Sequence, residues 1–391
     1  MAGARRRPVE SQVSTRGVAL ATVQQGCLAL ADITGYTQYL AGVELEHSQD
    51  VLADLMSTVV NQMRGLLHLA KLEGDAVFCY EHAGEADGST LLAMIESCYF
   101  AFAKRLQLID RHTTCECNAC RLIPRLNLKF AVHQGQFVIH EVAGSRELVG
   151  RDVIVAHRLL KNSVSKQMGL RGYALLTEAC VQRFGFDPAV LSMTAHTEAY
   201  EDVGEIAGYV LNLEERWQEE QRRRAVYIAP GQGYAISEFD LTGPPPIVWD
   251  YLTSPAKRVL WQPDTLRVEE THAQGVRGVG TVNHCVHGGF TVEEEYLDWK
   301  PFQYYSDHST TPMGSARFTT ELTPLGPDRT RVTIRMQPDV PPDASPDMMQ
   351  MFEQTMLPML RHTMHVSAES LAKLLAGVKA EAQERSESLA E

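Results

Sequence analysis

Two aspartates in this chain of 391 residues stand where a pair of carboxylates could hold divalent metal ions. Asp32 follows the apolar run at 27–31, which is typical of a buried strand, and Asp75 follows Gly74 in a turn before a second such run at 76–80. If these strands are neighbours, both carboxylates lie at one sheet edge and, with phosphate oxygens, offer an ordinary magnesium environment. Gly35 would let backbone amides approach a triphosphate. Acidic residues are also common at strand ends and turns, so the spacing alone leaves a purely structural role open.

A second group with possible metal chemistry is a cysteine cluster at 115–120. Cys115, Cys117 and Cys120 place three thiols within six residues, and His112 is the nearest candidate for a fourth ligand. Zinc prefers four ligands in a tetrahedron, and closely spaced cysteines in a loop are a common way to supply them. We expect a structural zinc site here, with a cysteine-rich surface loop as the alternative. The other five of the eight cysteines are scattered and are expected to be reduced thiols.

The elements that must position the aspartates alternate between strands and helices. Residues 1–23 are expected to be a flexible lead-in, and residues 24–213 to form one domain. Strands are predicted at 27–31, 76–80 and 126–132, and helices at 51–69, 91–109 and 152–164, from the spacing of the apolar residues. The order strand, helix, hairpin, helix, strand is that of a ferredoxin-like α/β sandwich.

The remainder of the chain has a different pattern of charged and apolar residues. Residues 214–232 are dense in charge and predict an exposed linker helix followed by a break at Pro230-Gly231. Residues 233–380 predict a second domain, with several alternating strands and a long final helix. Ser345 and Pro346 predict a helix start, and Pro358 is expected to kink the final helix or to mark its beginning. Residues 381–391 are expected to be a polar tail. The sequence therefore predicts an α+β protein of two domains.

Five blocks of the first domain resemble the catalytic domain of class III nucleotidyl cyclases, the adenylyl and guanylyl cyclases. They are LADITGYT at 30–37, KLEGD at 71–75, LNLKFAVHQG at 126–135, ELVGRDVIVAHRLL at 147–160 and YALLTEACV at 173–181. The resemblance covers about residues 24–213 in the family's order. Five matching blocks are far more specific than any one of them.

The resemblance implies roles for individual residues. Asp32, the carbonyl of Ile33 and Asp75 fall where the family holds two metal ions, Mg²⁺ or Mn²⁺. Gly35 belongs to the same nucleotide-binding turn. Lys71 and Glu147 fall where the family reads the purine ring, which favours ATP, and Arg158 falls where it stabilises the transition-state phosphate. In this family each site is built across a dimer interface, so a head-to-tail homodimer is implied.

Two positions depart from the family pattern. Ile154 stands where the family has a ribose-positioning asparagine, and the segment 201–211 has no counterpart of its late triphosphate-binding lysine. Each loss could reduce the rate of catalysis by orders of magnitude. The predicted function is metal-dependent binding of a nucleoside triphosphate, with cyclisation to a 3′,5′-cyclic nucleotide and pyrophosphate as the enzymatic form. The alternative is a non-catalytic module for nucleotide sensing and dimerisation.

The second domain resembles the START-like polyketide cyclase/dehydrase superfamily, which has the helix-grip fold. The resemblance rests on residues 235–263, on GVGTVNHC at 278–285, and on the strands and long helix that follow. It implies a curved antiparallel sheet around a C-terminal helix, with an apolar cavity for a small hydrophobic ligand between them. A group of methionines could line such a pocket or simply pack in the core: Met348, Met349, Met351, Met356, Met359 and Met364.

The overall composition excludes several classes of partner. The chain has 36 basic and 49 acidic residues, a formal net charge of −13, which argues against broad binding to nucleic acid. The apolar stretch at 17–31 is interrupted by Gln24, Gln25 and Gly26, so it falls short of a membrane span. No compact apolar core or cleavage site follows Arg5, Arg6 and Arg7, so no signal peptide is predicted. A cytoplasmic location is expected.

Overall fold

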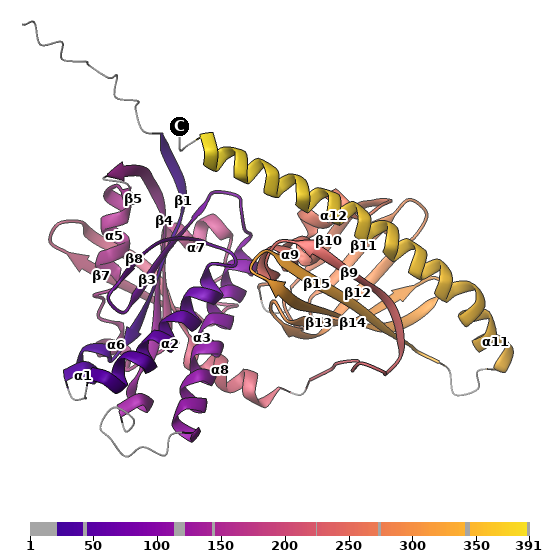
Figure 1. Ribbon diagram of the computed structural model, residues 1–391, viewed down its shortest axis with the longest axis horizontal. Coiled ribbons are helices and arrows are strands. Elements are labelled where there is room, and N and C mark those ends of the chain that lie inside the picture. The colour runs from indigo at the N-terminus through magenta and orange to yellow at the C-terminus, as the bar shows by residue number, and fades with distance from the viewer. Residues whose placement is uncertain are drawn as a thin grey trace, which may run out of the picture.

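The fold contains two β-sheets, one in each half of the chain (Figure 1). The structure is a computed structural model that describes residues 22–41, 45–112, 122–142, 145–223, 225–272, 275–340 and 345–388. The predicted zinc cluster of Cys115, Cys117 and Cys120 lies outside these residues, and so do nearly all of the expected lead-in and the last three residues of the expected tail. The prediction of a two-domain α+β protein is confirmed.

The centre of the first sheet has the predicted ferredoxin-like order. Its strands are β1 (Val23–Thr34), β2 (His68–Glu73), β3 (Ala76–His82) and β4 (Asn127–Val142), which lie side by side as β2-β3-β1-β4. Helix α2 (Leu45–Met63) follows β1, and α3 (Gly88–His112) follows β3. β1 is antiparallel to both of its neighbours. The two aspartate-bearing segments therefore end at the same edge of the sheet.

Further elements extend this sheet beyond β4. The strand β6 (Tyr173–Thr177) pairs parallel with β4, and β8 (Gly204–Asn212) and β7 (Thr194–Tyr200) follow it. β5 (Ser145–Val149) forms a hairpin with the end of β4. The helical elements of this half are α1 (Tyr36–Ala41), η1 (Ile123–Arg125), α5 (Arg151–Leu159), α6 (Val164–Met168), α7 (Glu178–Phe184) and α8 (Leu213–Arg222).

The alternation of β1 explains how helices cover both faces of the sheet. Cys27, Ala29 and Ala31 face α2 and α3, and they belong to the same buried core as Leu55 and Phe102. The residues between them, Leu28 and Leu30, face the other side. There they pack with Phe78 and Phe137 of the sheet and with Val153 and Ala156 of α5. Because successive strand residues point to opposite faces, one apolar run can supply both cores.

Two of the predicted helices were too long. The helix predicted at 51–69 ends at Met63, because the backbone from His68 onwards pairs with β3 as strand β2. The helix predicted at 152–164 divides into α5 and α6. Asn162 separates them, since its side chain donates to the carbonyl of Leu159 and accepts from the amide of Val164. Such local side-chain bonds compete with the helix ladder.

The second sheet is antiparallel and is packed against helices, as the helix-grip prediction requires. Its order is β10-β11-β12-β13-β14-β15-β9. Its strands are β9 (Tyr234–Thr242), β10 (Thr265–Thr271), β11 (Val282–His287), β12 (Thr291–Lys300), β13 (Tyr304–Thr311), β14 (Gly314–Gly326) and β15 (Arg329–Pro338). Helices α9 (Pro245–Thr253) and α10 (Pro255–Trp261) follow β9. Figure 1 shows the final helix running along this domain.

The final helix begins as the sequence predicts. The hydroxyl of Ser345 accepts a hydrogen bond from the amide of Met348 and caps α11 (Pro346–Met351). A π-helical turn, η2 (Phe352–Met356), leads into α12 (Leu357–Ser388), whose second residue is Pro358. The methionines do not form a buried group: Met348, Met351 and Met359 are 39–57% exposed. Neither a methionine-lined pocket nor simple core packing describes these three residues.

The two domains contact each other through the segment at 85–90. Thr90 donates to the buried carboxylate of Asp250, and the ammonium of Lys257 donates to the carbonyl of Glu85. The guanidinium of Arg277 lies 3.1 Å from the carboxylate of Asp87 and also pairs with Glu270 of its own domain. The predicted linker helix α8 is not simply exposed, since the ring of Trp217 packs at a tilt against Phe100 of α3, with the ring centroids 5.3 Å apart.

Candidate nucleotide and metal site

Asp32 and Asp75 come together at one edge of the first sheet. Asp32 pairs with Ala76, the residue after Asp75, in the ladder between β1 and β3. The amide of Ile33 donates to the carbonyl of Asp75 at 3.3 Å, which holds the β2–β3 turn against the end of β1. Burial and the negative charge of Asp32 raise the pKa of Asp75 to about 6. Two carboxylates that repel each other in this way would gain from a shared cation.

A lysine that the sequence analysis did not select lies beside this pair. Lys129 stands directly opposite Asp32 in the ladder between β1 and β4, and its ammonium lies 3.1 Å from Asp32 Oδ2. The same ammonium donates to the carbonyl of Leu160, just beyond α5, at 2.8 Å. Lys129 belongs to the segment 126–135 that resembles the cyclases, but only the strand register shows that its side chain reaches Asp32.

Gly35 and Ile33 form the turn beyond Asp32. Gly35 has a φ of +91°, and a Cβ there would come within 3.0 Å of the carbonyl oxygen of Arg125. Both features favour glycine at this position. Ile33 is buried. The turn therefore stays tight against the sheet edge that carries the two aspartates.

Lys71 and Glu147, the two predicted purine-reading residues, form an ion pair with each other. Lys71 Nζ lies 3.1 Å from Glu147 of β5 and 2.9 Å from Glu73 of its own strand. His157 of α5 also contacts Glu73, at 2.9 Å. The hydrogen bond to Glu73 raises the pKa of Lys71. These ion pairs link β5, β2 and α5. Lys71 and Glu147 were predicted from the sequence, whereas Glu73 and His157 were not.

Arg158 is not brought to the aspartate pair within one chain. It lies in the last turn of α5, where its guanidinium contacts Asp202 at 2.5 Å, and both side chains are largely exposed. Ile154, at the position of the family's asparagine, is 55% exposed on the same helix. The outer surface of α5 thus carries Arg151, Ile154 and Arg158, each exposed.

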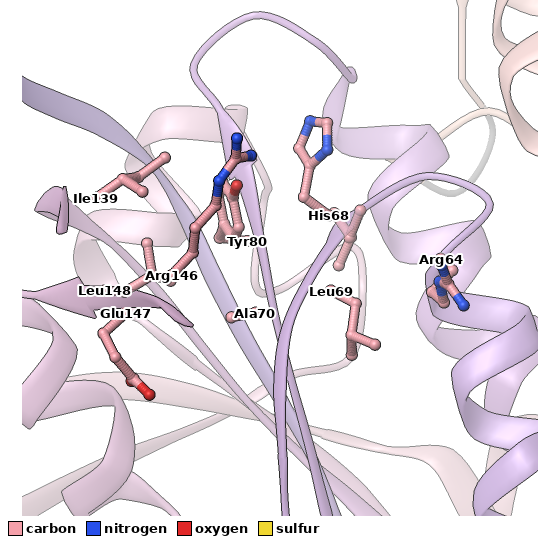
Figure 2. A pocket seen from close by; sticks show the side chains of 10 residues that line it. Arg64, His68, Leu69, Ala70, Tyr80, Ile139, Arg146, Glu147 and Leu148 are labelled. Atoms are coloured by element: carbon pink, nitrogen blue, oxygen red, sulfur yellow. The ribbon is translucent and has the colours of Figure 1, made fainter. Parts of the chain in front are cut away.

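A cavity of about 320 Å³ lies next to the Lys71–Glu147 pair (Figure 2). Glu147 and Arg146 of β5 line one side of it, and His68 and Leu69 of β2 line another. Tyr80 of β3 also lines it. Burial raises the pKa of Tyr80, although the nearby charge of Arg146 opposes that shift.

The interior of the second domain is more polar than the predicted apolar cavity. The guanidinium of Arg258 on α10 makes two hydrogen bonds to the half-buried carboxylate of Glu294 on β12, at 2.6 and 2.8 Å. Burial is the main cause that raises the pKa of Asp307 on β13 to about 7, and the negative charge of Glu294 adds to it. The carbonyl oxygen of the buried Asn283 side chain has no hydrogen-bond partner in the described structure. A ligand there would meet charged and amide groups as well as apolar ones.

The described part of the chain bears on two other expectations. His112 is the last residue of α3, but its three predicted partner cysteines are not described, so the zinc site stays a prediction. None of the described helices is both long enough and apolar enough to cross a bilayer.

Comparison with known proteins matches each half of the chain. Residues 52–168 match a family described as protein of unknown function (DUF2652), and residues 237–375 match the family "Polyketide cyclase / dehydrase and lipid transport". The second match confirms the resemblance stated for the second domain. The uncharacterized protein Rv2561/Rv2562 of Mycobacterium tuberculosis is 31% identical over 164 residues, which are 41% of this chain and 73% of that protein.

Solved structures that match include cyclases. A bacterial light-regulated adenylyl cyclase is 12% identical with a TM-score of 0.39, and the match covers 50% of this chain and 54% of that one. The guanylyl cyclase Cya2 is 11% identical with a TM-score of 0.37, covering 49% and 92%. The adenylyl cyclase CyaB from P. aeruginosa is 15% identical with a TM-score of 0.34, covering 48% and 95%. This chain thus spans about half the length of the light-regulated enzyme.

Proposed function

This chain belongs to the same family as the uncharacterized Mycobacterium tuberculosis protein Rv2561/Rv2562, and we propose that it binds a nucleoside triphosphate together with divalent metal ions. The observation that carries the proposal is the meeting of Asp32 and Asp75 at one sheet edge. Asp75 has a pKa of about 6 because it is partly buried beside Asp32. A site that holds two carboxylates so unfavourably is suited to a cation.

The donor set at this edge fits Mg²⁺ or Mn²⁺, which prefer oxygen ligands. Asp32 and Asp75 would hold the metal ions, with the Ile33 carbonyl as a further oxygen. Bound metal would supply positive charge to the triphosphate and lower the pKa of the attacking 3′-hydroxyl. Lys129 adds an ammonium next to Asp32, where phosphate oxygens would lie. It would take the place of the family's late triphosphate-binding lysine, which has no counterpart in this chain.

The base-reading and transition-state groups would come from a second copy of the chain. Within one chain, Lys71 and Glu147 pair with each other, and Arg158 on the exposed side of α5 pairs with Asp202. A head-to-tail homodimer would place these groups of one subunit against the aspartates of the other. ATP is the favoured nucleotide, and its cyclisation would yield a 3′,5′-cyclic nucleotide and pyrophosphate.

The second domain would bind a small hydrophobic ligand. Support comes from the match to the polyketide cyclase and lipid-transport family and from the long helix α12 packed on the sheet, with Leu371 and Leu375 buried. The ion pair of Arg258 and Glu294 suggests that such a ligand carries a polar group. Ligand binding there could reach the nucleotide domain through the contact at 85–90.

A product assay tests the enzymatic form of the proposal. The protein is incubated with ATP, GTP, CTP and UTP in turn, with Mn²⁺, and cyclic nucleotides are sought by mass spectrometry. We expect product with ATP that disappears in Asp32→Asn but persists in the control Asp54→Asn, which changes a partly exposed aspartate of α2 paired with Arg105.

The second candidate function is a non-catalytic nucleotide-sensing and dimerisation module. It is favoured by Ile154, which offers no hydrogen bond to a ribose, and by the pairing of Arg158 with Asp202. Metal-dependent nucleotide binding without product from any of the four nucleotides would select this function.

A further inference from the structure

Three potential metal ligands meet at the far end of the β2–β3 hairpin from Asp75. They are His68 at the start of β2, His82 at the end of β3, and Glu85 in the turn that follows. One ligand atom from each side chain lies within 4.8 Å of the others. The ladder pairs His68 with Tyr80, two residues before His82, so the two histidines lie on the same face of the sheet. Their ring centroids are 5.3 Å apart.

The carboxylate of Glu85 already organises this cluster. It contacts His68 Nε2 at 3.1 Å and accepts a hydrogen bond from the backbone amide of His82 at the same distance. The side chains of His68 and Glu85 are 51% and 40% exposed, so an ion from solvent can reach them. Two imidazoles and one carboxylate form a donor set that zinc and other late first-row metals favour. Three protein ligands leave one coordination position open to water.

The surroundings of the cluster give such an ion two possible effects. His68 also lines the 320 Å³ cavity, so the ion would sit at the rim of that space. Figure 2 shows the His68 ring across the cavity from Ile139 and Glu147. Glu85 also begins the segment that contacts the second domain, since its carbonyl accepts from Lys257 at 2.9 Å. An ion that fixed Glu85 would therefore steady this contact.

We propose that His68, His82 and Glu85 bind one zinc-like divalent ion, separate from the Asp32–Asp75 site and independent of nucleotide. The site would link β2 to the 82–85 turn and thereby stabilise the contact between the domains. Magnesium would be a poor occupant, because it prefers oxygen ligands.

The test is a Co²⁺ titration of the full-length, chelator-stripped protein. Cys115, Cys117 and Cys120 are replaced by serine so that thiolates cannot contribute, and excess Mg²⁺ is present to occupy the carboxylate pair. We expect one Co²⁺ per chain, visible by its d–d absorption without a thiolate charge-transfer band. Zn²⁺ should displace the Co²⁺ and raise the midpoint of thermal unfolding.

Single substitutions then assign the site. In the same background, His82→Gln and Glu85→Gln should each weaken Co²⁺ binding about 100-fold and abolish the thermal shift caused by Zn²⁺. The matched control is His284→Gln, which removes a partly exposed histidine that pairs with the carboxylate of Glu293. It should leave binding unchanged. Absence of Co²⁺ binding by the unsubstituted background, or binding that survives both His82→Gln and Glu85→Gln, would overturn the proposal.

Discussion

At the scale of single residues, the candidate site is governed by the repulsion between Asp32 and Asp75. The pKa of Asp75 rises from 3.8 to about 6 because the group is partly buried and faces Asp32. The folded, metal-free protein therefore holds a proton that the unfolded chain would release between these two pH values. This group consequently destabilises the metal-free fold as pH rises through that window. A bound cation would remove this effect.

Metal affinity should accordingly depend on pH. A proton on Asp75 competes with Mn²⁺, so we expect the affinity for Mn²⁺ to increase as pH rises towards about 6 and to level off above it. Titrations of Mn²⁺ at several pH values on both sides of 6, in the absence of nucleotide, measure this. Asp75→Asn should bind weakly at every pH. An affinity of the unsubstituted protein that does not change across the range would contradict the account.

Lys129 should compete with the metal for Asp32. Replacing it with methionine removes an ammonium 3.1 Å from Asp32 Oδ2. We expect Lys129→Met to bind Mn²⁺ more tightly in the absence of nucleotide, by about tenfold, because the carboxylate loses its internal counter-ion. Lys166→Met, on the exposed surface of α6, is the control. Weaker Mn²⁺ binding by Lys129→Met would show that the ammonium assists the metal instead of opposing it.

At the scale of elements, the strands were predicted better than the ends of the helices. The continuous apolar run at 27–31 was sufficient because both faces of this strand are buried, one against α2 and α3 and the other against α5. The helix predicted to reach position 69 ended at Met63, because apolar spacing cannot distinguish a last helical turn from the start of an edge strand. The helix propensity of this segment carries no information on the pairing of His68 with Tyr80, which makes it a strand.

The candidate site was predictable to the extent that it depends on local motifs. Asp32 lies near the end of a strand that its apolar run predicts, and Gly35 and Asp75 lie in turns that glycine predicts. Lys129 was missed because its role depends on the register between β1 and β4, which is set by long-range pairing. Glu73 and His157 were missed for the same reason, since β2 and α5 meet only in the folded chain. The roles of these residues in binding stay predictions.

Helix α5 carries a direct test of the cyclase hypothesis. Ile154 is 55% exposed, so an asparagine there should not disturb the core. If the site is a weakened cyclase, Ile154→Asn restores a ribose-positioning hydrogen bond and should increase the rate of cyclic product formation by about tenfold or more. Val149→Asn, a substitution at a similarly exposed apolar residue of β5, is the matched control. Equal rates in the two variants would remove the support for a ribose-binding role of this position.

At the scale of the whole molecule, the two domains are joined by buried charges as well as by the chain. Arg277 is 6% exposed and bonds Asp87 of the first domain and Glu270 of the second. Asp250 and Thr90 form a second, buried contact nearby. In Figure 1 the two domains lie side by side, with α12 extending along the second and back towards the first. A contact of this kind gives the second domain a physical connection to the first domain.

Removing Arg277 should therefore destabilise the protein strongly. Arg277→Ala leaves two carboxylates without their partner in a largely buried position, which costs about 3 kcal/mol in the free energy of unfolding. Arg267→Ala removes an exposed ion pair with Glu269 and should cost at most about 1 kcal/mol. Urea denaturation of both variants measures the difference. Similar losses in the two would show that the contact between the domains contributes little.

The measurement that tests the central claim most directly is the affinity of the protein for ATP with and without Mn²⁺. Binding is followed by calorimetry for the unsubstituted protein, for Asp32→Asn, and for the control Asp54→Asn. The account predicts that Mn²⁺ strengthens ATP binding at least tenfold, and that Asp32→Asn alone abolishes this gain. ATP binding that does not depend on Mn²⁺, or that is the same in Asp32→Asn, would contradict it.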